Sequence, residues 1–88
     1  MYIHLGNETV VREEDVIGIF DMESTTVLKN TRNFLSKAEK EKKVINVSYE
    51  LPKSFIVCGD KKTKEWNVYI SQISSSTLLK RAGVLYKT

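Results

Sequence analysis

The stretch "SFIVCGDKKTKEWNVYI", residues 54–70, has the pattern of two β-strands joined by a turn. The segment "SFIVCG" is rich in strand-forming residues, and in "WNVYI" the apolar residues Trp66, Val68 and Ile70 occupy every second position. The intervening "DKKTKE" is polar and has three lysines at its centre, as suits an exposed turn. We therefore predict a β-hairpin with a basic tip.

The first twenty residues contain three short apolar runs, which are "YIHL", "TVV" and "DVIGIF". Gly6-Asn7 separates the first two, and the charged residues 12–14 separate the second from the third. Short apolar runs broken by turn-forming or charged residues are typical of strands and turns. We expect a β-meander in this region.

An amphipathic helix is predicted at about 25–42, where apolar residues recur at spacings of three and four. Its apolar face comprises Val27, Thr31, Phe34, Leu35 and Ala38. Its charged face comprises Lys29, Arg32, Lys37, Lys40 and Glu41. We expect Ser24 or Thr25 to cap its N-terminus, since short hydroxyl side chains are preferred there.

A further strand is predicted from Val44, where the apolar period returns to two. This period places Ile45, Val47 and Tyr49 on one side of the strand. Pro52 is expected to end it.

Residues 74–77 are three serines and a threonine, and they lie within "YISQISSSTLLKRAG" at 69–83. Hydroxyl side chains directly before an apolar pair are typical of a helix N-cap, so we predict a short helix through Ala82, with Gly83 just past its end. The same helix N-terminus, with its amides and hydroxyl groups, also suits an anionic oxygen, and Lys80 and Arg81 would add positive charge nearby. Capping and phosphate contact are compatible interpretations.

Together these elements predict an α+β fold of mostly antiparallel β-strands, with one central amphipathic helix and a short C-terminal helix. The 88 residues fit a single domain, 1–88. A core this small provides little stability by itself, so small domains are usually stabilised by disulfides, by a metal or by self-association. The single cysteine, Cys58, allows neither an internal disulfide nor a cysteine-based zinc site, which leaves self-association as the expected source of stability.

No apolar run approaches the roughly 18–20 residues that span a bilayer, and the N-terminus lacks a secretory pattern, so we expect a cytoplasmic protein with no membrane partner.

The sequence shows no recognisable set of catalytic residues. His4, the only histidine, lies in an apolar strand and is expected to be a packed structural residue, as is Cys58. The acidic residues 13–15 fit a solvated turn better than acid–base or metal chemistry, and the serines have no local base. We therefore predict no enzyme, no metal site and no cofactor.

Charge is unevenly distributed along the chain. Residues 1–23 hold one cation and six anions, for a net −5, whereas residues 24–88 hold thirteen cations and five anions, for a net +8. A basic region of this kind suits a polyanion partner, although lysines that merely solvate a helix face give the same composition. The polarity also suits self-association, in which the acidic region of one copy meets the basic region of the next.

Four blocks lie in order along the chain: "YIHLG" at 2–6, "DVIGIFD" at 15–21, "PKSFIV" at 52–57 and "YISQISSSTLLKRA" at 69–82. In this order they resemble the RemB branch of the RemA and RemB family, small bacterial regulators of extracellular matrix and biofilm genes. The resemblance implies a DNA-binding transcriptional regulator with a fold similar to LytTR-type DNA-binding domains. It also implies a ring-shaped homo-oligomer around which double-stranded DNA wraps.

The chain departs from the RemA branch at two places where that branch carries arginines. Just before "DVIGIF" it has Glu13-Glu14, and in the turn "LPKS" its only cation is Lys53. The candidate nucleic-acid-binding residues are Lys53 and Ser54 for phosphate contacts, Arg12 as a neighbouring cation, Lys80 and Arg81 beside the bound backbone, and, more weakly, Arg32 and the "KKTK" tip at 61–64. The alternative function is an oligomeric interaction module that acts through a partner such as a RemA-like protein, with weak or no DNA binding.

Overall fold

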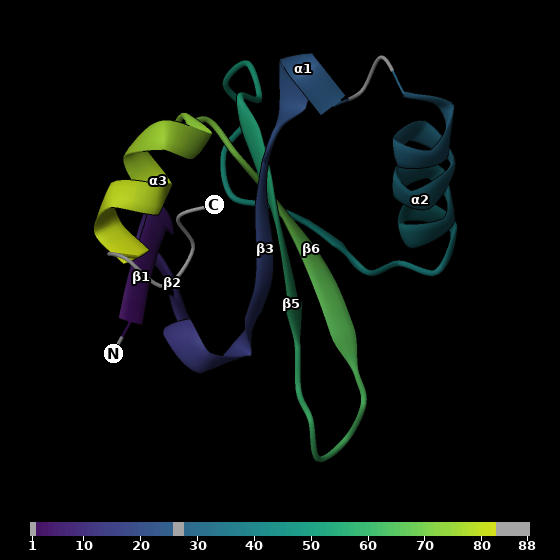
Figure 1. Ribbon diagram of the computed structural model, residues 1–88, viewed down its shortest axis with the longest axis horizontal. Helices are drawn as coiled ribbons and strands as arrows, with labels where there is room; N and C mark the ends of the chain where they lie inside the picture. The colour runs from purple at the N-terminus through teal and green to yellow at the C-terminus, as the bar shows by residue number, and fades with distance from the viewer. Residues whose placement is uncertain (1, 26–27, 83–88) are drawn as a thin grey trace.

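Two β-sheets and three α-helices make up the part of the protein that the computed structural model describes, residues 2–25 and 28–82 (Figure 1). The smaller sheet is the hairpin of β1 (Tyr2–Gly6) and β2 (Thr9–Arg12). The larger sheet has the order β3-β5-β6-β4, and its strands are β3 (Val16–Asp21), β4 (Val44–Asn46), β5 (Ser54–Gly59) and β6 (Trp66–Ser71). The helices are α1 (Met22–Thr25), α2 (Lys29–Lys40) and α3 (Ser75–Ala82), and a short 3-10 helix, η1 (Glu13–Asp15), joins β2 to β3. The predicted α+β class is confirmed.

The predicted hairpin is formed by β5 and β6, which pair antiparallel from Ser54↔Ser71 to Gly59↔Trp66. Its tip is closed by Asp60, whose amide donates to the carbonyl of Glu65 at 2.8 Å. The Asp60 carboxylate accepts the amide of Lys62 at 2.8 Å, and a longer bond of 3.4 Å from the amide of Thr63. The alternation of strand residues and the turn chemistry therefore specify this element locally.

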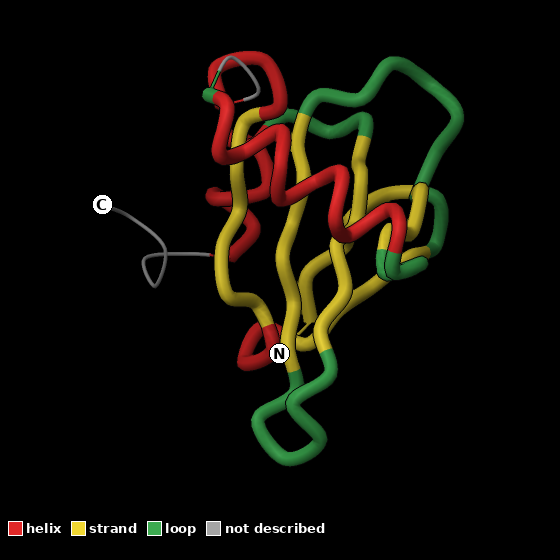
Figure 2. The backbone as a smooth tube through the Cα atoms, turned by 90° about the vertical axis from the view of Figure 1, so that its right-hand side faces the viewer, coloured by secondary structure: helices red, strands yellow, loops and turns green. Residues whose placement is uncertain are grey.

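The larger sheet is covered on both faces. Helix α2 covers one face, where Ala38 packs with Phe55 and Val68, and Figure 2 shows this helix running diagonally across the strands. The β1–β2 hairpin and α3 cover the other face (Figure 1). The core there contains Ile3, Leu5, Val11, Val16, Val47, Ile56, Cys58, Leu78 and Ala82. Because β5 is central and buried on both faces, its sequence is a continuous apolar run rather than an alternating one.

The helix expected at about 25–42 is shorter than predicted, and a separate short helix precedes it. Helix α1 ends at Thr25, and α2 begins at Lys29 after Leu28, which has extended backbone angles and no side-chain cap. The expected cap by Ser24 or Thr25 is therefore wrong for the long helix. Instead, the Asp21 carboxylate accepts the Ser24 amide at 2.8 Å and stabilises the start of α1. Val27, expected on the apolar face, lies outside the described residues.

The expected meander of the first twenty residues is also wrong, because β3 pairs with β5 and not with β2. The turn of η1 redirects the chain between the two sheets. Strand β4 is shorter than expected and pairs parallel with β6. Val47, after its end, is buried, whereas Tyr49 is fully exposed, so Ile45, Val47 and Tyr49 do not share one side of a longer strand. The amide of Glu50 binds the Ser48 hydroxyl at 3.1 Å, which turns the chain at this point.

Within the described ranges, no helix is both long enough and apolar enough to cross a membrane.

Candidate nucleic-acid interface

Lys53 projects from a fixed piece of backbone at one end of the larger sheet. Its amide donates to the carbonyl of Ser71 at 2.9 Å, and its own carbonyl accepts the amide of Met22 at 2.9 Å. The side chain is exposed. A cation held in this way keeps its position without losing contact with solvent, which suits an electrostatic contact with a phosphate.

The surroundings of Lys53 are mixed in charge. Lys53 lines an open groove together with Ser74 from the loop before α3, but Asp21 and Glu23 line the same groove. The Ser24 amide and hydroxyl are hydrogen-bond donors to Asp21, and these bonds lower the pKa of its carboxyl below its ordinary value, which stabilises the charged form. These two anions reduce the positive potential near Lys53. The proximity of these anions to Lys53 could not be predicted from the sequence, because residues 21 and 53 come together only through the pairing of β3 with β5.

Ser54 is not a surface residue. It is fully buried, and its hydroxyl donates to the carbonyl of Ile73 at 2.7 Å. Because its one proton is used inside the protein, we remove the Ser54 side chain from the candidate phosphate contacts.

The predicted cap of α3 is confirmed. Ser74 precedes the helix, and its hydroxyl accepts the amide of Thr77 at 3.4 Å, while its carbonyl accepts the amide of Leu78 at 3.1 Å. Lys80 and Arg81 lie in the last turn and are exposed. A rise of 1.5 Å per residue places them about 9–10 Å along the axis from Ser74, so they form a contact point separate from the helix N-terminus.

Arg81 is held against the first strand. Its guanidinium donates to the carbonyl of His4 at 2.9 Å. His4 is exposed, so its expected role as a packed residue is wrong. The alternation in β1 turns Ile3 and Leu5 into the core and His4 outward.

Cys58 is buried, as the sequence analysis predicted. This burial, together with the charge of Asp15, raises the pKa of its thiol to about 11.

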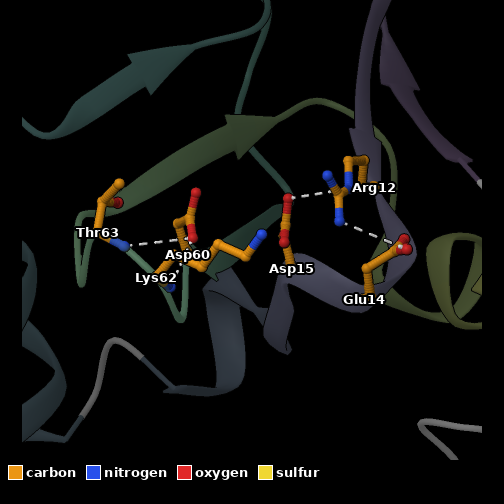
Figure 3. A network of polar contacts seen from close by, with 6 residues as sticks. All are labelled: Arg12, Glu14, Asp15, Asp60, Lys62 and Thr63. Carbon is orange, nitrogen blue, oxygen red and sulfur yellow. Dashed lines mark hydrogen bonds and ion pairs between the residues drawn. The ribbon is translucent and has the colours of Figure 1, made fainter.

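Arg12 lies in an acidic cluster at the other end of the sheet. Figure 3 shows its guanidinium between Glu14 at 3.6 Å and Asp15 at 3.5 Å. A backbone hydrogen bond and then the charge of Arg12 lower the pKa of Glu14. The register places Val16 opposite Cys58 near the hairpin tip, and Asp21 opposite Ser54 at the Lys53 end. Four steps along β5, from Cys58 to Ser54, separate these ends by roughly 13 Å, so Arg12 is not a neighbour of Lys53 in one copy.

Arg32 lies on the opposite side of the larger sheet from Lys80 and Arg81. It lies in the first turn of α2, which covers one face of the sheet, whereas α3 covers the opposite face (Figure 1). The structure therefore brings Lys53 close to the start of α3, places Lys80 and Arg81 at the end of that helix, and separates both from Arg12 and Arg32.

The amino-acid sequence can also be compared with known proteins. The family model for RemA-like proteins, described as extracellular matrix regulatory protein A-like, matches residues 2–82. The chain belongs to this family of regulatory proteins, which confirms the resemblance seen in the sequence. It is similar to extracellular matrix regulatory protein B of Bacillus subtilis (strain 168), with 40% identity over 87 residues that cover 99% of this chain and 96% of that protein.

Proposed function

We propose that the protein is a non-enzymatic, cytoplasmic regulator of transcription that binds double-stranded DNA through phosphate contacts as a homo-oligomer, and that it controls extracellular matrix and biofilm genes. Family membership supports the regulatory role. The DNA contact rests on the exposed cations of the loop before β5 and of α3.

One observation carries the proposal. Lys53, Lys80 and Arg81 are exposed, and in the described part of the chain none of them lies within ion-pairing distance of a carboxylate. Arg12, in contrast, contacts two carboxylates. Cations without an acidic partner can replace the counterions that surround DNA, and release of these counterions is the main source of sequence-independent affinity.

Self-association strengthens the proposal because one copy offers few contacts. Three cations that neutralise about three phosphates give only weak binding at physiological salt. Several copies joined on one DNA add their contacts through a high effective concentration. We therefore assign DNA binding to the assembled protein.

A second candidate is an interaction module that acts through a protein partner such as a RemA-like protein. The loop that carries Lys53 also exposes Tyr49 and Leu51, which are 103% and 80% accessible. Aromatic and aliphatic side chains in such positions are typical of contacts with proteins. Asp21 and Glu23 beside Lys53 also favour this alternative.

A salt titration of binding to a fluorescent DNA duplex distinguishes the two. For the proposed function, affinity falls steeply with salt, and Lys53→Ala lowers both the affinity and the salt slope, the slope by about 1. Lys37→Ala is the matched control, because Lys37 is also exposed but lies on α2 beside Glu41 at 3.9 Å. Absence of binding at low salt, at concentrations where the protein is assembled, would establish the interaction module instead.

A further inference from the structure

The tip of the β5–β6 hairpin, residues 60–65, carries three lysines that the proposed function does not use. Lys61, Lys62 and Lys64 are exposed, and within residues 2–25 and 28–82 none of them lies within ion-pairing distance of a carboxylate. The three lysines give residues 61–64 a net charge of +3. Cations of this kind can replace the counterions of a polyanion.

Hydrogen bonds hold the backbone of the tip in one shape. The Lys64 amide donates to the carbonyl of Asp60 at 2.7 Å, and Lys64 has a left-handed φ of 61°. The Glu65 amide donates to the Thr63 hydroxyl at 3.3 Å, and the Asp60 carboxylate accepts the amides of Lys62 and Thr63. Binding therefore requires little further ordering of this turn, which favours affinity.

The two carboxylates of the tip lie at its base rather than at its apex. Asp60 and Glu65 flank the lysines in the sequence, and both line the grooves on the two sides of the hairpin, one beside Val11 and the other beside Phe34. Three cations and two anions give residues 60–65 a net charge of +1, but the cations are concentrated at the apex. A polyanion that approaches along the hairpin therefore meets the lysines first.

The shape of the tip fits a groove of duplex DNA. The tip projects beyond the other elements at one end of the molecule (Figures 1 and 2). Paired strands are about 4.8 Å apart, and the major groove of B-form DNA, which is about 12 Å wide, admits a two-stranded β-ribbon. Lysines on both sides of an inserted turn can reach phosphates on both walls of the groove.

An anionic membrane is the other polyanion to consider. The segment "DKKTKE" contains no apolar side chain that could insert into a lipid surface. Its three lysines are also fewer than the roughly 4–8 cations that are typical of segments bound to anionic lipids. The composition of the tip therefore favours DNA.

The tip and Lys53 lie at opposite ends of β5. Lys53 directly precedes this strand and the tip directly follows it, and the six residues of Ser54–Gly59 span about 20 Å. Between these ends, α2 covers one face of the sheet, and the β1–β2 hairpin with α3 covers the other. A straight duplex bound across the Lys53 end therefore does not reach the tip.

We propose that the hairpin tip enters the major groove of a second DNA duplex, so that the protein holds two duplexes, one at each end of the larger sheet. Lys61, Lys62 and Lys64 contact the phosphates of this second duplex. The inference rests on the DNA-binding part of the proposed function, and it extends that function from binding DNA to bridging two DNA segments.

A bridging assay tests the proposal with the full chain. A biotinylated duplex is held on streptavidin beads, and the protein is expected to retain a fluorescent second duplex on them. The triple variant Lys61→Gln, Lys62→Gln, Lys64→Gln should retain about tenfold less of the second duplex, while its binding to a single duplex at low salt changes by no more than about threefold. The control is the triple variant Lys29→Gln, Lys37→Gln, Lys40→Gln, which loses the same charge from exposed positions of α2 and should bridge like the wild type. Circular dichroism and sedimentation velocity confirm that both variants keep the fold and mass of the wild type.

Two variants of Asp60 separate the shape of the turn from its charge. Asp60→Asn and Asp60→Ala remove the same negative charge, but only asparagine keeps an oxygen that accepts the amides of Lys62 and Thr63. Asp60→Asn should therefore bridge at least as well as the wild type, and Asp60→Ala should bridge about threefold less than Asp60→Asn. Equal bridging by the two variants would contradict a preformed turn.

The remaining outcomes distinguish this inference from the proposed function. If the wild type binds no DNA at low salt, the DNA-binding part of the proposed function fails. If it binds one duplex but retains no second duplex, or if the tip variant bridges as well as the α2 control, only the bridging role is wrong. Loss of binding to vesicles of anionic phospholipid in the tip variant, with bridging unchanged, would assign the tip to a membrane instead.

Discussion

The hydroxyl of Ser71, at the end of β6, donates a hydrogen bond of 2.7 Å to the carbonyl of Leu5 in β1. The same hydroxyl accepts the amide of Ile73 at 3.0 Å, and the buried Ser54 hydroxyl binds the carbonyl of Ile73. Both serines are fully buried. The bond to Leu5 attaches the β1–β2 hairpin to the larger sheet in a fixed position, which apolar packing alone does not specify, and the two bonds to Ile73 fix the segment that follows β6.

Ser71→Ala should lower the free energy of unfolding by about 1–3 kcal/mol, because it leaves two backbone groups without their hydrogen-bond partner. Urea unfolding followed by tryptophan fluorescence measures the change. Ser36→Ala, at an exposed position of α2, is the control and should change stability by no more than about 0.5 kcal/mol. Equal stability of the two variants would contradict a structural role for the Ser71 hydroxyl.

Gly18→Ala should destabilise the protein by about 1 kcal/mol through the ring of Phe20. A Cβ at position 18 would lie 2.6 Å from two ring atoms of Phe20, and this ring stacks on Phe55 with centroids 5.0 Å apart. The ring would have to leave its stacked position. In a double-mutant cycle, Gly18→Ala should be nearly neutral when Phe20 is already replaced by Ala, whereas an undiminished cost would locate the strain elsewhere.

Cys58 should make the free energy of unfolding fall as the pH rises through the alkaline range. Burial, and then the charge of Asp15, raises its pKa from 9.0 to about 11, so the folded protein retains a proton that the unfolded chain loses. This contribution to stability is complete below about pH 9 and is lost as the pH rises to about 11. Because other groups titrate in this range, the quantity to measure is the stability of the wild type minus that of Cys58→Ala. A difference that stays constant across this window would show that the thiol does not titrate as proposed.

If Lys53 contacts a DNA phosphate as proposed, Glu23→Gln should strengthen DNA binding, because Glu23 lines the groove beside Lys53. Removing one of the two anions there raises the potential at the proposed phosphate contact, and an increase of roughly two- to fivefold at low salt is expected. Fluorescence anisotropy with a labelled duplex provides the measurement. Glu39→Gln, on α2, is the control with the same charge change, and an equal gain from both would indicate net charge alone.

Locally encoded parts of the fold were predictable from the sequence. The hairpin over 54–70 follows from alternation and turn chemistry, and the cap at Ser74 follows from hydroxyl residues before an apolar pair. The pairing of β3 with β5 and the parallel position of β4 were not predictable, because they depend on contacts between segments distant in sequence. The start of α2 at Lys29 was placed too early because Ser24 and Thr25 are suitable cap residues and Val27 has the spacing of the apolar face.

The candidate interface was predicted unevenly for similar reasons. The exposure of Lys53, Lys80 and Arg81 follows from their charge. Ser54 was misplaced because a serine at the start of a strand gives no sign in the sequence that it is buried against Ile73. Arg12 forms ion pairs with Glu14 and Asp15, which are two and three residues away in the sequence. These adjacent acidic residues could have indicated in advance that Arg12 is paired with carboxylates.

The contact between β1 and α3 also affects how the protein can be made. Ile3 and Leu5 share a core with Leu78 and Ala82, although the ribosome adds the latter pair long after the former. While the chain is being synthesised, the N-terminal hairpin has an apolar face with no completed partner, so this part of the core can form only after residues 78–82 have emerged. Folding of the nascent chain should therefore be completed late, and a chain stalled before α3 would be a natural target for chaperones and proteases.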